Sequence, residues 1–216
     1  MAYSAVLFDL DGTLLDTLAD LADSGNWALG QLGCAEHPTE SYKYFVGDGV
    51  ENLVRRALPA GRSDAATVAR CAELVREAYG RRWAEKTRPY PGIPELLDAL
   101  VARRMPMAVL SNKPDDFTRL CVGRLLPRWP FAAVVGARAS LERKPDPAGA
   151  LLIAERLGLA PAEILYLGDT NTDMQTAVAA GMFPVGALWG FRTAEELTAS
   201  GAQRLIESPR ELVELL

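Results

Sequence analysis

The sequence is poor in histidine and cysteine, the side chains that most often build transition-metal sites and nucleophilic triads. It contains a single histidine, His37, and three cysteines that lie far apart and form no Cys-x-x-Cys pair. One histidine excludes a histidine-rich metal site and disfavours a Ser-His-Asp hydrolase. The spacing of the cysteines indicates neither a disulfide framework nor a zinc knuckle. Any chemistry in this chain must therefore depend mainly on carboxylates.

Positive charge and long apolar stretches are also in short supply. Lysine and arginine number 23 against 28 aspartate and glutamate residues, a net charge of -5 that opposes binding to nucleic acid. No apolar stretch approaches the ~18 to 20 residues of a membrane span, and residues 1–4 lack the basic and then apolar layout of a signal peptide. We therefore expect a cytoplasmic protein, a monomer or a homodimer, with neither nucleic acid nor membrane as partner.

What the 216 residues do contain is an alternation of short apolar runs and helical patterns. Buried strands are predicted at 5–8, 107–110, 132–135 and 164–167, and helices at 94–103, 115–126, 147–157 and 173–180. Strands that alternate with helices predict a parallel sheet with right-handed crossovers. The expected fold class is α/β, with a Rossmann-like core.

Residues 17–88 follow a different pattern, because they show helical periodicity and no convincing strand. Helices are predicted there at 22–32, 39–45, 50–58 and 64–83. The expected domains are a core of residues 1–16 and 89–216 and an inserted helical domain of residues 17–88. The segment 87–92, rich in Pro and Gly, is either a hinge between the two domains or only a Pro-rich helix start.

Polar residues gather where the predicted strands end, which is where an open parallel sheet forms its ligand crevice. They are Asp9, Asp11, Ser111, Asn112, Lys144, Asp169 and Asp173. Paired acids at two strand ends suit a hard cation with oxygen ligands, namely Mg²⁺. The hydroxyl, amide and lysine supply hydrogen-bond donors and positive charge, which an anion needs. The combination predicts a site for Mg²⁺ and a phosphate.

Each of these residues also has a purely structural interpretation. Asp169 and Thr170 can cap the following helix, and Asp173 can be a first-turn acid that the helix dipole favours. Lys144 can be a surface lysine and Ser111 a turn residue. A calcium loop is excluded, because neither acidic segment has Gly at its sixth position or Glu at its twelfth. The conjunction of these groups at successive strand ends favours the site.

The same segments resemble the four motifs of the haloacid dehalogenase superfamily, in their usual order along the whole chain. The motifs correspond to residues 9–14 with 16–17, 110–112, 144–145, and 168–170 with Asp173. The helical insert is similar to the small helical cap domain of this superfamily. Within this superfamily the chain most resembles the phosphoglycolate phosphatases. This finer resemblance depends on residues 46–53, 90–92 and 189–197.

The resemblance implies a Mg²⁺-dependent phosphatase for a small phosphorylated metabolite, with hydrolysis of 2-phosphoglycolate to glycolate and phosphate as the first expectation. Asp9 would be the nucleophile that forms an aspartyl-phosphate, and Asp11 the general acid and base. Mg²⁺ would be held by Asp9, by Asp169 and by Asp11 through its backbone carbonyl.

The remaining motif residues would bind the phosphate or support the site. Ser111, Asn112 and Lys144 would contact the phosphoryl oxygens; Gly12 would permit a tight turn. Thr13 would contribute to phosphate binding, because its hydroxyl would hold the nucleophile in place. Asp173 and Thr170 would lie behind these groups, with Asp173 orienting a metal-bound water or Lys144.

Substrate choice would belong to the inserted domain. The segment Gly47, Asp48, Gly49 precedes a predicted helix, whose free amides suit a small carboxylate, and Arg56 could add a clamp. Alternatively the segment is a turn with Asp48 as the helix cap, and Arg56 is solvated.

Other activities stay open. The substrate could be pyrophosphate, a sugar phosphate or a nucleotide. An isomerase of the β-phosphoglucomutase type is less favoured, because Leu21 stands where a cap histidine is expected. A non-catalytic phosphate-binding protein would not need Asp11.

Overall fold

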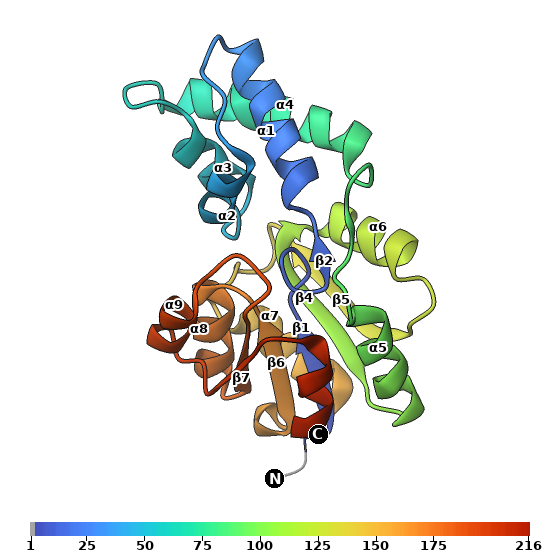
Figure 1. Ribbon diagram of the computed structural model, residues 1–216. Coiled ribbons are helices and arrows are strands. Elements are labelled where there is room, and N and C mark those ends of the chain that lie inside the picture. The colour runs from blue at the N-terminus through green and yellow to red at the C-terminus, as the bar shows by residue number, and fades with distance from the viewer. Residues whose placement is uncertain (1–2) are drawn as a thin grey trace. The chain divides into compact units, whose positions relative to one another are not determined.

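The computed structural model describes residues 3–216 (Figure 1), and the chain forms two compact units. The first unit comprises the residues up to Leu15 together with Pro89–Leu216, and the second comprises Asp16–Arg88. The chain passes between them at two very short strands, β2 (Leu15–Asp16) and β3 (Arg88–Pro89), which pair with each other.

The first unit contains a six-stranded sheet in the order β5-β4-β1-β6-β7-β8. Its strands are β1 (Ala5–Phe8), β4 (Met107–Pro114), β5 (Phe131–Ala137), β6 (Ile164–Gly168), β7 (Phe183–Ala187) and β8 (Arg204–Ile206). All five strand pairings are parallel. Every residue of β1 is buried, since helices cover both faces of the sheet and leave no face for polar side chains. The predicted fold class is confirmed.

Helices cover this sheet on both sides. They are α5 (Ile93–Ala102), α6 (Asp115–Leu125), α7 (Ala148–Leu157), α8 (Asn171–Ala180) and α9 (Ala194–Ala199), with short 3₁₀ helices at Pro161–Glu163 and Pro209–Leu215. On one face, Leu7 and Tyr166 of the sheet pack in a single apolar cluster with Ile153 of α7 and Ala177 of α8. Figure 1 shows α5 on the opposite side of the sheet.

The second unit is built from helices. They are α1 (Leu18–Gln31), a 3₁₀ turn at Thr39–Ser41, α2 (Tyr42–Phe45), α3 (Val50–Ala57) and α4 (Ala65–Arg82). The two longest, α1 and α4, pack against each other, and both contribute buried apolar side chains to this unit, among them Leu29 and Val75. Within residues 3–216, none of the helices combines the length and apolar character that a membrane crossing requires.

The sheet geometry places several strand ends at one edge. Strand β1 lies between β4 and β6, with Phe8 in register with Val109 on one side and Leu167 on the other. Because these three strands run parallel, the residues that follow each of them emerge at the same edge. The side chains of the candidate site therefore come from segments far apart in the sequence.

Candidate active site

Three buried aspartates converge at this edge of the sheet. Asp9 follows β1, Asp169 follows β6, and Asp173 lies in the first turn of α8. One carboxylate oxygen of each residue lies within 4.8 Å of the corresponding oxygens of the other two. The structure thus brings together acids that are more than 150 residues apart in the chain.

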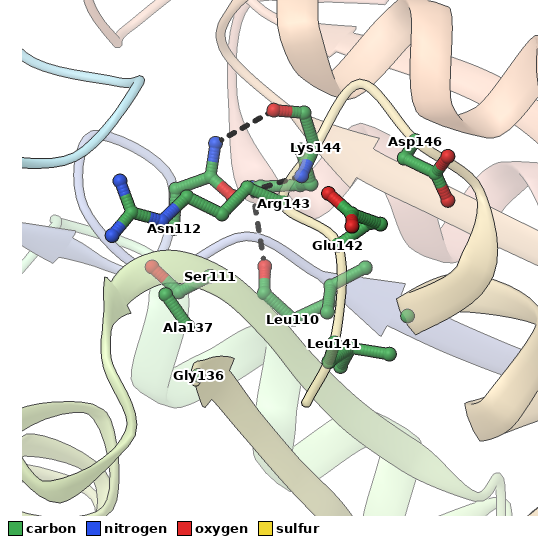
Figure 2. Close-up of a pocket in the computed structure, with 11 residues that line it drawn as sticks. Leu110, Ser111, Asn112, Gly136, Ala137, Leu141, Glu142, Arg143, Lys144 and Asp146 are labelled. Carbon is green, nitrogen blue, oxygen red and sulfur yellow. Dashed lines mark hydrogen bonds between the residues drawn. The ribbon is translucent and has the colours of Figure 1, made fainter. Parts of the chain in front are cut away.

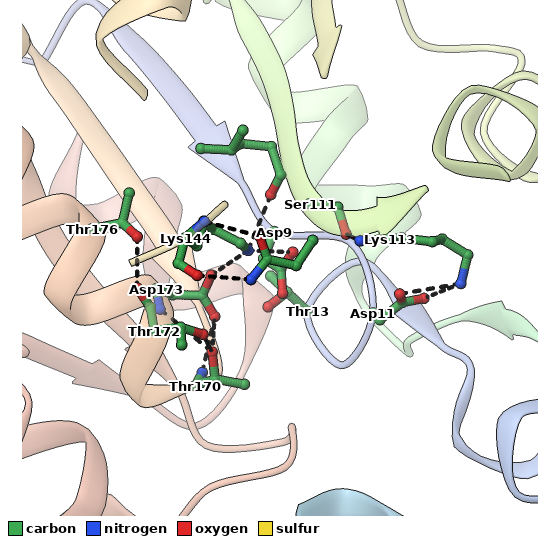
Figure 3. A network of polar contacts seen from close by, with 12 residues as sticks. Asp9, Asp11, Thr13, Ser111, Lys113, Lys144, Thr170, Thr172, Asp173 and Thr176 are labelled. Atoms are coloured by element: carbon green, nitrogen blue, oxygen red, sulfur yellow. Dashed lines mark hydrogen bonds and ion pairs between the residues drawn. The ribbon is translucent and has the colours of Figure 1, made fainter. Parts of the chain in front are cut away.

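Lys144 supplies a positive charge to this trio. Its Nζ lies 2.8 Å from Asp9 Oδ1 and 2.6 Å from Asp173 Oδ1, and it also donates to the backbone carbonyl of Leu110 at 3.2 Å (Figures 2 and 3). The Lys144 side chain is only 3% exposed. A lysine this deeply buried needs paired partners, so Lys144 is a component of the site and not a solvated surface residue.

Asn112 holds the backbone of Lys144 in place. Its Nδ2 donates to the Lys144 carbonyl at 3.0 Å, and its Oδ1 accepts from the Lys144 amide at 2.9 Å. Both contacts are buried, and Figure 2 shows the bond to the carbonyl. The Asn112 side chain therefore ties the end of β4 to the loop that carries the lysine.

The trio carries more negative charge than Lys144 can balance. Burial, followed by the charge of Asp173, raises the pKa of Asp9 well above its usual range, while Lys144 opposes the shift. Burial and the charge of Asp173 also raise the pKa of Asp169 from 3.8 to about 7. Although burial opposes it, the charges of Asp173 and Asp9 hold the pKa of Lys144 well above its usual value. Such a centre favours an additional cation.

Asp169 is held from two sides. The Thr13 hydroxyl donates to Asp169 Oδ1 at 2.7 Å, and the Phe191 amide donates to Oδ2 at 2.9 Å. The expected contact of Thr13 with the nucleophile is therefore replaced by a contact with Asp169, because the turn after β1 passes beside the end of β6. Trp189 Nε1 donates to the Thr13 carbonyl at 3.0 Å and anchors that turn.

Two glycines allow the chain to approach Asp169 closely. A Cβ at Gly12 would lie 2.2 Å from Asp169 Oδ2, and one at Gly190 would lie 2.2 Å from the Asp169 Cβ. Gly12 also has φ +91°, in the region that side chains rarely adopt. The predicted need for glycine at position 12 follows from both the turn and the contact.

Asp11 lies apart from the trio. Both of its carboxylate oxygens accept from Lys113 Nζ, at 2.9 and 3.1 Å, and Figure 3 shows this pair turned away from Asp9. An acid-base role was expected to need an Asp11 side chain that points away from the metal ligands and lies among other carboxylates. The direction is the expected one, but the partner of Asp11 is a lysine and not a carboxylate. Lys113 was not predicted from the sequence as a member of the site.

Asp173 has two functions at once. Its Oδ2 accepts from the Thr170 amide and hydroxyl at 3.0 and 2.6 Å, which is the capping arrangement at the start of α8. Its Oδ1 accepts from Lys144 and, at 3.2 Å, from the Tyr166 hydroxyl. Thr170 is therefore the N-cap residue of α8, with Asp173 as its first-turn acid, and the expected contact of Asp173 with Lys144 is present. The contact of Asp173 with Tyr166 was not predicted from the sequence.

Ser111 lies beside a pocket at the ends of β4 and β5. The pocket is lined by Ser111, Asn112, Lys144 and residues of the loop 141–146 (Figure 2). Ser111 is buried, and its Oγ accepts from the Lys113 amide at 3.2 Å. Strand β4 therefore delivers Ser111, Asn112 and Lys113 in succession to the site edge.

Comparison with known proteins agrees with this arrangement. A model of the haloacid dehalogenase-like hydrolases matches residues 6–187, which include all four motif segments. The chain belongs to the haloacid dehalogenase-like hydrolase family. The resemblance inferred from the motifs is confirmed.

Relatives of this haloacid dehalogenase-like hydrolase align over nearly its whole length. It is 35% identical to the phosphoglycolate phosphatase of Nitrosospira multiformis, over 98% of this chain and 95% of that protein. It is 34% identical to the phosphoglycolate phosphatase of Pseudomonas putida, over 96% of this chain and 78% of that protein. A solved structure of a candidate phosphoglycolate phosphatase from Lactobacillus delbrueckii superposes with a TM-score of 0.92 at 30% identity, covering 99% of this chain and 98% of that one.

In the second unit of the hydrolase, the segment 47–49 is fixed by Arg56. The guanidinium pairs with the Asp48 carboxylate and also donates to the Phe45 carbonyl at 3.2 Å. Gly49, with φ +91°, occupies the N-cap position of α3. The interpretation of Asp48 as a helix cap is therefore wrong, because its carboxylate is engaged by Arg56.

Proposed function

We propose that this hydrolase is a Mg²⁺-dependent phosphatase that converts 2-phosphoglycolate into glycolate and phosphate through a phosphorylated Asp9. The observation that carries the proposal is the position of Asp9 at the end of the central strand. There it is buried, paired with Lys144 at 2.8 Å, and grouped with two further carboxylates. The curated relatives named above supply the substrate.

The reaction would take place in two displacements. In the first, an Asp9 carboxylate oxygen attacks phosphorus, the bond from phosphorus to the glycolate oxygen breaks, and that oxygen takes a proton from the Asp11 carboxyl group. In the second, water attacks phosphorus and gives a proton to the Asp11 carboxylate, and the bond between Asp9 and phosphorus breaks. Phosphate leaves, and both aspartates return to their starting states.

The first displacement must overcome charge repulsion. A carboxylate and a phosphate meet with roughly 4 kcal/mol of repulsion per pair of unit charges at 4 Å and an effective dielectric constant of 20. We assign Lys144 to offset this charge, because its ammonium group is already fixed against Asp9. Ser111 and the backbone of Asn112 would donate hydrogen bonds to the phosphoryl oxygens, and Gly12 would keep the turn below them narrow.

The acidic trio fits a hard divalent cation, since one oxygen of each carboxylate lies within 4.8 Å of those of the other two. The three carboxylates together also carry more negative charge than the single ammonium group of Lys144 balances. We propose that Asp9, Asp169 and the Asp11 carbonyl would hold Mg²⁺. Asp173 would support them, as its oxygens are bonded to Thr170, Tyr166 and Lys144. Bound Mg²⁺ supplies positive charge to the phosphoryl oxygens during the displacement.

The second unit would act as a cap domain that recognises the rest of the substrate. Support comes from the segment 47–49, where the α3 amides and Arg56 provide a partly positive environment that suits the substrate carboxylate. Asp48 neutralises part of the Arg56 charge, so we assign the larger share of carboxylate binding to the amides.

The test is a phosphate-release assay on purified protein with Mg²⁺. We expect the highest kcat/KM for 2-phosphoglycolate among phosphoglycolate, pyrophosphate, sugar phosphates and nucleotides. Asp9→Asn should lower turnover by about 10³-fold or more, because the nucleophile is lost. The matched control Asp116→Asn, which alters an exposed acid of α6, should retain activity.

Three outcomes would contradict parts of this proposal. A tenfold preference for another phosphate ester would overturn the substrate. Undiminished turnover by Asp9→Asn would overturn the nucleophile assignment. Conversion of one phosphosugar isomer into another without phosphate release would favour a mutase.

A further inference from the structure

Lys113 forms a second buried ion pair beside the trio. Its ammonium group contacts both carboxylate oxygens of Asp11, at 2.9 and 3.1 Å. The side chains of Lys113 and Asp11 are 4% and 12% exposed. Two charges withdrawn from water to this extent are stable together only while each keeps its partner, so the geometry of the pair is well defined.

The backbone on both sides of Lys113 is also fixed. Its amide donates to Ser111 Oγ at 3.2 Å, and its carbonyl accepts from Thr118 Oγ1 at 3.1 Å. Thr118 belongs to α6, so the end of β4 is fastened to the helix that follows it. The ammonium group therefore projects from a rigid support.

The two lysines contact different aspartates of the site. Lys144 contacts Asp9 and Asp173, whereas Lys113 contacts Asp11. In Figure 3 the two lysines lie on opposite sides of the turn that carries Asp9 and Asp11. Asp11 is therefore held away from the acidic trio, with the plane of its carboxylate oriented by a contact to each oxygen.

Resting on the proposed function, we propose that Lys113 is a positioning residue for the acid-base step. When Asp11 carries the proton, one carboxyl oxygen bears it toward the leaving oxygen of the substrate, and Lys113 holds the group in that orientation through the other oxygen. Lys113 itself neither gives nor accepts this proton. Its contribution should therefore depend on how much the leaving group needs protonation.

Leaving groups provide the test. The alkoxide of glycolate is too basic to depart without a proton, whereas p-nitrophenolate is stable and departs unassisted. In Lys113→Met, we expect kcat/KM for 2-phosphoglycolate to fall by about 10²-fold, the lower end of what general acid catalysis contributes. The loss should appear in kcat, and kcat/KM for p-nitrophenyl phosphate should stay within about threefold of the wild type, since that step uses no acid.

Two further variants complete the design. Lys113→Arg keeps a cation beside Asp11 and should recover most of the loss on phosphoglycolate. Arg119→Met removes a cation of similar length from the exposed pair with Asp115 on α6, and should leave both substrates unaffected. If Lys113→Met does not fold, the same comparison is made with Lys113→Gln.

The outcomes separate this inference from the proposed function. An equal fall on both substrates, a rise in KM at unchanged kcat, or no change at all would overturn the positioning role while leaving the phosphatase intact. A wild-type protein that hydrolyses no phosphate ester would overturn the proposed function and this inference with it. If another alkyl phosphate is the better substrate, the comparison with p-nitrophenyl phosphate is made on that ester.

Discussion

Asp9 and Asp11 lie two residues apart, yet their surroundings differ in ways that suit different tasks. Asp9 is paired with Lys144 and faces two further carboxylates, whereas Asp11 is paired with Lys113 and faces away from them. Identical side chains can thus serve as nucleophile and as acid-base group, because burial and partners determine how each one handles charge.

Gly12 offers a direct test of the packing around Asp169. Gly12→Ala places a Cβ 2.2 Å from Asp169 Oδ2 at φ +91°. We expect it to lower the free energy of unfolding by about 1 to 3 kcal/mol through backbone strain and to reduce activity by displacing Asp169. Urea unfolding and phosphate release measure the two effects.

A matched control is available in the same unit. Gly123 lies in α6, has no heavy atom within 4 Å of its would-be Cβ, and is not in the left-handed region. Gly123→Ala should therefore raise the free energy of unfolding by about 0.5 to 1 kcal/mol and leave activity unchanged. Equal behaviour of the two variants would contradict the close approach of Gly12 to Asp169.

At this scale the sequence predicted the candidate groups but only some of their partners, such as Asp173 for Lys144. Asp9, Lys144 and Asp169 were predicted because each follows or precedes a regular element at the sheet edge. Lys113 was missed, because a lysine after a strand carries no signal by itself. Its pairing with a residue 102 positions earlier appears only when β1 and β4 lie side by side.

Among the elements, α1 and the end of the second unit are joined by one buried carboxylate. Asp20, in the first turn of α1, is 1% exposed. Its oxygens accept from the Lys86 amide at 3.0 Å, the Thr87 amide at 2.8 Å and the Thr87 hydroxyl at 2.7 Å. The first turn of α1 is thereby fastened to the last residues of the unit.

We expect Asp20→Ala to lower the free energy of unfolding by about 2 to 4 kcal/mol, because it leaves buried donors without an acceptor. The control is Asp23→Ala in the same helix, which removes only a solvent-exposed pair with Lys86 and should cost less than about 1 kcal/mol. Urea unfolding compares the two variants, and hydrogen exchange of residues 86–88 should accelerate only in Asp20→Ala. Similar losses in both variants would contradict the fastening role.

The elements themselves were predictable where hydrophobic patterns are continuous. The runs at 5–8, 107–110, 132–135 and 164–167 all form strands, since a buried parallel strand needs apolar side chains on both faces. Strand β7 was missed because Pro184 and Gly186 interrupt its pattern, and β8 because it has three residues. Both segments form strands because they pair with neighbouring strands of the sheet, and not because their own residues favour the strand conformation.

For the molecule as a whole, protonation of Asp169 makes the free energy of unfolding depend on pH. The pKa of Asp169 rises from 3.8 to about 7 on folding, so between these pH values the folded state binds more protons than the unfolded state. The free energy of unfolding should therefore decrease as pH rises through that range in the absence of divalent ions. A cation that replaces the proton should restore it.

Thermal melts with EDTA or Mg²⁺ at pH 5 and pH 8 measure this linkage. We expect Mg²⁺ to stabilise the protein more at pH 8, by about 2.7 kcal/mol when its concentration is 100 times the Kd. Asp169→Asn should abolish most of the Mg²⁺ effect. A stabilisation that is the same at both pH values, or that persists in Asp169→Asn, would contradict the assignment of Asp169 as a ligand of the cation.

The central claim is that Asp9 carries the phosphoryl group during turnover, and trapping that intermediate tests it most directly. Asp11→Asn should accumulate it from p-nitrophenyl phosphate, since departure of that phenolate needs no acid while attack by water still needs the base. Borohydride converts an aspartyl-phosphate into homoserine, which peptide mass spectrometry locates. We expect homoserine at position 9 in the treated enzyme. Nitrophenolate released in a stoichiometric burst with homoserine at another position, or at none, would contradict the account.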